Sequence, residues 1–271
     1  EGPHGITVDP NGNFWYLSLA HGNPFGKLVK YSTESNEILG ETTLGLFPAS
    51  MQVSTTTGFL YCVNFNLHGS MKPSTVSVVD PVTMTEITTI TTGSMPHGSR
   101  ISPDGLFQYS VAMMSGELFE VDALGLEVSR TLDLENKMIK NDVTKHSMDG
   151  MKSMDGMKSM DGMKSMDGMK SMDGMKHSMV KPTWVIPHPN KNLAYVAGNG
   201  SDEVIEVDLD EWKVSDRFNT GKGPYNLEIS PDAKLLIGTI KSEGKTAIWS
   251  LEDKKLPVSY THLTLPTSDL V

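Results

Sequence analysis

Hydrophobic and polar residues alternate along most of this chain in short runs that predict β-strands. One apolar run spans residues 14–19 and follows the turn sequence Asp-Pro-Asn-Gly, which is typical of a hairpin. A strand with period-two alternation is predicted next, over residues 27–31, and the same order returns later in the chain. No window longer than a turn or two has helical periodicity. The pattern therefore predicts an all-β protein.

The strand pattern recurs with a fixed period. Segments that begin with proline and run through a short strand into a turn start at Pro3, Pro48, Pro96, Pro182 and Pro224. Their starts are separated by 45, 48, 86 and 42 residues, which is the period of a propeller blade with one connection lengthened by an insertion. A fourth strand, such as residues 86–91, follows the alternating one, so we predict a β-propeller of four-stranded antiparallel blades.

The repeats resemble the YVTN-type β-propeller family, especially the bacterial YncE-like and lactonase-like proteins. The motifs that carry the resemblance are Met-Pro-His-Gly-Ser-Arg at residues 95–100, Ser-Val-Val-Asp at 77–80, Pro-Thr-Trp at 182–184 and Ser-Asp-Glu-Val-Ile-Glu-Val-Asp at 201–208. The resemblance implies a ring of seven blades and a periplasmic or extracellular location. It implies no single function, because such propellers include binding proteins and enzymes.

Only part of such a ring is expected in this chain. Four complete repeats and three strands of a fifth fit before residue 255, so we predict about five of seven blades, an incomplete ring, and a chain that is a fragment of a longer protein. The predicted segments are blades one to three at residues 1–137, an insert at 138–181, blades four and five of the same domain at 182–255, and a tail at 256–271. The tail is predicted to be non-native, because Pro-Val-Ser-Tyr-Thr-His-Leu-Thr-Leu-Pro-Thr-Ser resembles a translated sequencing adapter. Alternatively, residues 259–265 complete the fifth blade.

The insert contains five copies of Ser-Met-Asp-Gly-Met-Lys between His146 and His177. Small and charged residues separate the methionines, so we expect disorder in the absence of a ligand. Soft thioether sulfur prefers copper(I) to hard cations. The predicted ligands of the insert are its histidines and methionines: His146, Met148, Met151, Met154, Met157, Met160, Met163, Met166, Met169, Met172, Met175, His177 and Met179. Two other interpretations stay open, namely neutral expansion of a tandem DNA repeat and a trap for oxidants.

Propeller geometry predicts further soft ligands on the face of the insert. The loops between blades emerge on the same face as the loops between the second and third strands of each blade. The side chains predicted in these two kinds of loop are His4, His97, His21, His68, Met113 and Met114. His188 aligns with a turn on the opposite face and is excluded. A mixed histidine and methionine site suits copper(I), whereas the alternative is a set of hydrogen-bonded loop residues.

Composition narrows the function classes. With a formal net charge of −10, the chain lacks the surplus of Lys and Arg that phosphate binding requires, so no nucleic-acid partner is expected. No stretch approaches the roughly 18 apolar residues that a membrane span needs. Cys62 is the only cysteine, so no intrachain disulfide is possible. Its apolar surroundings predict a buried position, and a copper ligand is the alternative.

These features favour a non-catalytic, extracytoplasmic propeller that binds copper(I) or another soft metal ion. An enzyme is the alternative, either a lactonase-like hydrolase or a copper or quinone oxidoreductase. The predicted face nevertheless has no carboxylate cluster and no Ser-His-Asp set. A third interpretation is an interaction scaffold, for which the partner is another protein bound on the same face.

Overall fold

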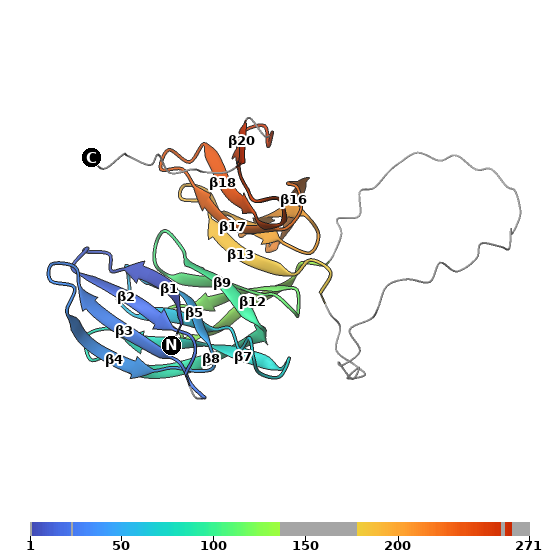
Figure 1. Cartoon of the computed structure of the whole chain (residues 1–271). Helices are drawn as coiled ribbons and strands as arrows, with labels where there is room; N and C mark the ends of the chain where they lie inside the picture. Colours follow the sequence, from blue (N-terminus) through green and yellow to red (C-terminus); the bar gives the residue numbers. More distant parts are fainter. Residues whose placement is uncertain (1, 23, 136–177, 256–257, 262–271) are drawn as a thin grey trace, which may run out of the picture.

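The computed structural model describes residues 2–22, 24–135, 178–255 and 258–261. Their strands form five sheets of four antiparallel strands, and each sheet contains four consecutive strands of the chain (Figure 1). The helical structure in this part of the chain is one 3₁₀ turn, Lys241–Glu243. No helix among these residues is long and apolar enough to cross a membrane. The predicted all-β architecture of four-stranded propeller blades is confirmed.

Each blade begins at the proline that starts a sequence repeat. Blade one contains β1 (Pro3–Val8), β2 (Phe14–Leu19), β3 (Lys27–Ser32) and β4 (Ile38–Thr43). Blade two contains β5 (Pro48–Val53), β6 (Leu60–Asn64), β7 (Pro73–Asp80) and β8 (Thr85–Ser94). Blade three contains β9 (Pro96–Ile101), β10 (Phe107–Ala112), β11 (Glu117–Asp122) and β12 (Glu127–Asp133). Blade four contains β13 (Pro182–Pro187), β14 (Leu193–Gly198), β15 (Glu203–Asp208) and β16 (Lys213–Asn219). Blade five contains β17 (Pro224–Ile229), β18 (Leu235–Ile240), β19 (Lys245–Ser250) and β20 (Val258–Thr261).

The fourth strand of blade five lies beyond the end that the repeats predicted. Only three strands of this blade were expected before residue 255, and residues 256–271 were expected to form a tail outside the blades. Within the described part of that tail, β20 pairs antiparallel with β19. Residues 258–261 thus occupy the place that the alternative interpretation assigned to residues 259–265.

The first strands of the blades, β1, β5, β9, β13 and β17, contact one another in sequence around a central channel. A side chain of one blade donates a hydrogen bond to the backbone carbonyl of the second residue in the next repeat. These bonds run from Ser18 to Ala49, from Ser50 to His97, from His97 to Thr183 and from Thr183 to Tyr225. Equivalent positions of successive repeats are therefore linked by hydrogen bonds around the channel.

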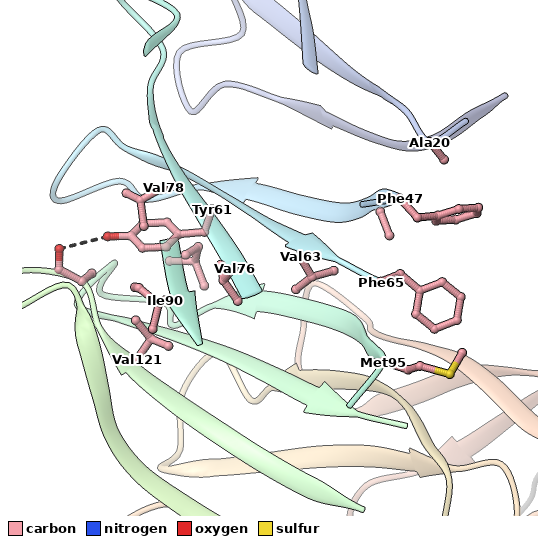
Figure 2. Packing of buried hydrophobic residues seen from close by; sticks show 13 residues of the cluster. Ala20, Phe47, Tyr61, Val63, Phe65, Val76, Val78, Ile90, Met95 and Val121 are labelled. Carbon is pink, nitrogen blue, oxygen red and sulfur yellow. Dashed lines mark hydrogen bonds between the residues drawn. The ribbon is translucent and has the colours of Figure 1, made fainter. Parts of the chain in front are cut away.

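Hydrophobic cores fill the space between neighbouring sheets (Figure 2). Tyr61 of blade two is fully buried, and its hydroxyl donates to the carbonyl of Ala123 in blade three at 3.0 Å. Cys62 is completely buried as well, and burial raises the pKa of its thiol to about 12. A neutral, inaccessible thiol is a packing residue, as the apolar sequence around it indicated.

The chain leaves blade three at Glu135 and returns beside it at Ser178. Glu135 Oε1 accepts hydrogen bonds from Ser178 Oγ at 2.6 Å, from the Met179 N–H at 2.7 Å and from the Val180 N–H at 3.1 Å. Val180 is buried in the core between blades three and four. Hydrogen bonds thus join the residues on either side of the described gap. Blades three and four pack against each other through a shared hydrophobic core. Most predicted ligands of the insert lie outside the described residues, namely His146, Met148, Met151, Met154, Met157, Met160, Met163, Met166, Met169, Met172, Met175 and His177.

Candidate functional site

Four predicted histidines gather at one mouth of the central channel, and they come from blades one, two and three. The ring centroids of His21 and His68 are 5.4 Å apart, and those of His4 and His97 are 6.2 Å apart. The antiparallel order of each blade explains this, because the end of the second strand lies beside the start of the first. These four histidines therefore lie on one face, as the sequence predicted.

Phe47 lies at the centre of this group. Its ring packs edge-on against His21, His4 and His68, with centroid distances of 4.9, 5.1 and 5.6 Å. Phe47 has a left-handed backbone with φ of 57°. That conformation costs an L-residue about 1–2 kcal/mol, so surrounding packing must hold it in place. Sequence reasoning missed Phe47, although its position directly before the repeat's proline could have marked it.

His97 is buried and bonded through both ring nitrogens. Its Nδ1 lies 2.7 Å from the carbonyl oxygen of Thr183, which can only accept, so Nδ1 carries the proton. Its Nε2 then accepts from the Tyr225 hydroxyl at 2.8 Å. Burial lowers the pKa of His97 to about 4; the hydrogen bond to Thr183 opposes this, and neighbouring His4 and Lys241 lower it further. His97 is thus neutral at pH 7, and metal binding there would require loss of the bond from Tyr225.

His21 and His68 are exposed and have no hydrogen-bond partner in the described parts of the chain. They line a pocket of about 270 Å³ together with Phe47 and Asn66. Partial burial lowers the pKa of His4, and the charge of His21 lowers it further, so His4 is neutral at pH 7. Imidazoles without hydrogen-bond partners are suitable ligands for a transition metal.

Two of the predicted methionines lie in one loop of blade three. Met113 and Met114 follow β10 and are half-buried, and the Ser178 N–H donates to the Met114 carbonyl at 3.0 Å. The returning end of the insert therefore contacts the loop that carries these two residues. Met95, beside Phe65 in Figure 2, packs into the same core cluster, and this methionine was missed by sequence reasoning.

The metal role of these residues stays a prediction. Met179 is 75 % exposed, as a ligand supplied by a surface loop would be. Within the described ranges, no three side chains of the His, Cys, Asp and Glu types are grouped so that they could hold a metal ion. A site at this face therefore depends on histidine pairs and on sulfur ligands.

A separate pocket of about 400 Å³ lies in the central channel. All five inner strands contribute to its lining, which includes His4, Ile6, Ser50, Met51, His97, Arg100, Trp184, Tyr225 and Asn226. Gly98 makes this close approach of strands possible, because a Cβ there would lie 2.5 Å from the Cα of Trp184.

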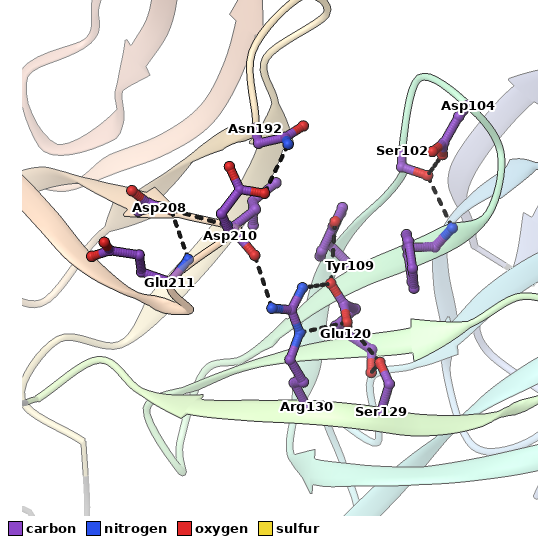
Figure 3. A network of polar contacts seen from close by, with 12 residues as sticks. Ser102, Asp104, Tyr109, Glu120, Ser129, Arg130, Asn192, Asp208, Asp210 and Glu211 are labelled. Atoms are coloured by element: carbon purple, nitrogen blue, oxygen red, sulfur yellow. Dashed lines mark hydrogen bonds and ion pairs between the residues drawn. The ribbon is translucent and has the colours of Figure 1, made fainter.

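The opposite face carries a polar network between blades three and four (Figure 3). Glu120 is almost fully buried, and it accepts hydrogen bonds from Arg130 and Ser129. Arg130 also donates to the carbonyl of Leu209 in blade four at 2.8 Å. The network satisfies a buried charge and joins two blades, which is a structural role. His188 lies in a pocket on this face, as the sequence predicted when it was excluded from the metal site.

Comparison with solved structures identifies the fold. One similar chain belongs to the crystal structure of the mitotic checkpoint complex, with a TM-score of 0.67 and 14 % identity over 95 % of this chain and 64 % of that chain. Another belongs to hydrazine synthase of Kuenenia stuttgartiensis, with a TM-score of 0.59 and 16 % identity over 93 % of this chain and 77 % of that chain. This chain has a β-propeller fold. It spans 64 % of the first of these neighbours.

The comparisons define no family within that fold. No protein-family model matches the sequence. No curated protein matches it either. In all, 1185 chains of solved structures resemble this propeller, and a fold shared so widely indicates no particular function.

Proposed function

We propose that this chain is a YVTN-type β-propeller that binds copper(I), outside the cytoplasm, on the face from which the methionine insert emerges. The supporting observation is the exposed pair of His21 and His68, which have no hydrogen-bond partner in the described structure and lie on the face where Ser178 returns from the insert. The motifs at residues 95–100 and 201–208 support the family and, through it, the location.

The chemistry of this face suits a soft, low-coordinate ion. Two imidazoles whose centroids are 5.4 Å apart can approach a common ion, since metal bonds to histidine nitrogen are about 2 Å long. Thioether sulfur from Met113, Met114 or the insert would complete the coordination and select copper(I) over hard cations. His4 is a further ligand in this proposal, whereas His97 is part of the channel wall because both of its nitrogens are already bonded.

An interaction scaffold is the second candidate. It is supported by the neighbour from the mitotic checkpoint complex, which is a protein assembly, although the likeness extends to the fold alone. The scaffold would bind another protein on the same face and would bind no metal above background. Copper affinity therefore separates the two candidates.

The test is an anaerobic titration of the reduced protein with copper(I) against a chromophoric chelator of known affinity. The wild-type chain should hold more than one ion with a micromolar or lower Kd. Removal of residues 136–177 should abolish most of this stoichiometry, and the double change His21→Ala with His68→Ala should abolish one ion. His188→Ala, on the opposite face, is the control and should leave the copper stoichiometry unchanged; because His188 is buried, the folding of this variant is checked by circular dichroism.

The two parts of the proposal fail separately. Unchanged stoichiometry after removal of residues 136–177 would exclude the insert, and unchanged stoichiometry in the double histidine variant would exclude the pair at the channel mouth. If the wild-type chain loses copper(I) to a weak chelator, the binding proposal as a whole is wrong.

A further inference from the structure

The channel pocket has an unusual charge for this protein. Arg100 is the one permanently charged residue in its described lining, and no carboxylate lines it. The chain as a whole carries a formal net charge of −10. A single guanidinium among apolar and aromatic walls favours a ligand of opposite charge, and Glu228, which lies outside this lining, is its present ionic partner.

Arg100 has a fixed position, but not all of its N–H donors have acceptors. Its guanidinium stacks on the Trp184 ring at 4.4 Å, and it donates to the Ser99 carbonyl and to Glu228 Oε1. Arginine has five N–H donors, so these two bonds leave three without an acceptor among the described residues. The Arg100 side chain is 19 % exposed and that of Glu228 is 57 % exposed, so the Glu228 carboxylate is largely hydrated and can be displaced.

Other groups at the pocket also favour an anion. Asn226 lines it, and its side-chain amide has no partner in the described structure, so its N–H groups are available. The ammonium group of Lys241 lies 4.6 Å from the Tyr225 ring centroid and forms no described ion pair. The Tyr225 hydroxyl already donates to His97, which leaves its ring as a fixed wall.

We propose that the channel pocket binds a small organic anion, with Arg100 as its ionic partner, Asn226 as a neutral donor and Lys241 as a second cation at the rim. The anionic group is a carboxylate or a phosphate monoester, both of which accept the planar, paired donors of a guanidinium. The body of the ligand is flat and apolar, because it rests against Trp184 and Tyr225. The volume of about 400 Å³ suits a molecule of this size.

The probes that test this are benzoate, phenyl phosphate and the uncharged isostere benzamide, titrated into the full chain. Isothermal calorimetry reports binding, and the intrinsic fluorescence of the four tryptophans, of which Trp184 lines the pocket, gives a second signal. Benzoate or phenyl phosphate should bind at least tenfold more tightly than benzamide. Arg100→Gln should weaken the anion at least tenfold, and Lys241→Gln should weaken it about twofold to fivefold. Lys234→Gln, in the turn between β17 and β18, is the control and should have no effect.

Glu228→Gln gives the sharpest outcome, because it removes the carboxylate that competes for Arg100. Anion affinity should rise several-fold in this variant, whereas a purely structural ion pair would predict a loss or no change. Glu228 and Lys241 are exposed, so their variants should fold. They therefore test anion binding even if Arg100→Gln does not fold. Equal binding of benzamide and benzoate, no binding of either anion at 10 mM, or weaker binding after Glu228→Gln would each overturn the proposal.

Discussion

His97 connects three blades through a single side chain. It belongs to β9, its Nδ1–H donates to Thr183 at the start of β13, and its Nε2 accepts from Tyr225 at the start of β17. Both bonds require the neutral ring with the proton on Nδ1. His97 is 3 % exposed, and protonation of Nε2 would break its bond from Tyr225. The packing of three blades therefore depends on the protonation state of His97.

The stability of the protein should depend on pH through His97. Burial holds its pKa at about 4 in the folded state, against 6.5 in the unfolded chain. Between these values the unfolded state binds the extra proton, so the contribution of His97 is complete above pH 6.5 and is lost as the pH falls toward 4. The loss should be at most roughly 3 kcal/mol. Urea unfolding at pH 7 and at pH 4.5 measures it.

His97→Gln is the comparison for this experiment. The variant is less stable at pH 7 because it loses at least one of the two bonds. Its stability should nevertheless fall less between pH 7 and pH 4.5 than that of the wild type, since the titrating ring is gone. Parallel pH profiles for the two proteins would show that His97 is not the group responsible.

Among the elements, the inner strands depend on one another through the hydrogen bonds to second-residue carbonyls. Thr183 is fully buried, and its Oγ1 donates to the Tyr225 carbonyl at 2.8 Å. These bonds join sheets that share no ladder, so they add directional contacts to the hydrophobic packing between blades. Valine has the same shape as threonine and removes only the hydroxyl, which makes the bond testable.

Thr183→Val should lower the free energy of unfolding by about 1–3 kcal/mol, because it leaves a carbonyl oxygen without its donor. Thr89→Val is the matched control. Thr89 is exposed on the outer strand β8 and makes no described side-chain hydrogen bond, so its stability should change by less than about 0.5 kcal/mol. Equal stability of the two variants in urea unfolding would show that the bond between β13 and β17 contributes little.

The connection between blades three and four should tolerate removal of the insert. Glu135 and Ser178 are already hydrogen-bonded at 2.6 Å, so a short glycine linker in place of residues 136–177 needs no change in either blade. The melting temperature should stay within a few degrees of the wild-type value. Removal that also takes Ser178 to Val180 should lower it clearly, because Val180 is buried and all three residues bond to Glu135. Calorimetry of both deletions checks this.

At the scale of the whole molecule, one side of blade one packs against no other sheet in the described structure. Ile6 is 66 % exposed and Val8 is 54 % exposed, whereas the residues at the same repeat positions of blade two, Met51 and Val53, are 3 % and 6 % exposed. The apolar residues of β5 pack against blade one, and those of β1 have no such partner. The exposure of equivalent residues in β1 and β5 thus depends on whether a neighbouring blade covers them.

Val8→Lys and Val53→Lys form a matched pair that tests this difference. Val8→Lys should leave the unfolding free energy within about 0.5 kcal/mol and should reduce the binding of a hydrophobic dye, because it interrupts an exposed apolar surface. Val53→Lys buries an unpaired charge and should cost several kcal/mol, which is enough to threaten folding. A similar loss in both variants would mean that the side of blade one is covered in solution.

Much of the fold follows from the sequence because its determinants are local. The prolines, the turns and the period-two alternation place nearly every strand, and the order of strands within a blade decides which loops share a face. His21 and His68 could therefore be assigned to one mouth of the channel in advance. The fourth strand of blade five was harder to predict, because residues 258–261 contain no turn or repeat motif and take their place by pairing with β19.

The sequence by itself determined the blade, its repeat and the face that His4, His21, His68 and His97 share. Tertiary structure alone decided which of those histidines is free. The partners of His97 lie 86 and 128 residues away, and Glu228 lies 128 residues from Arg100. Such contacts depend on how sheets are oriented across the channel, and that orientation arises from packing between blades rather than from any pattern within one of them.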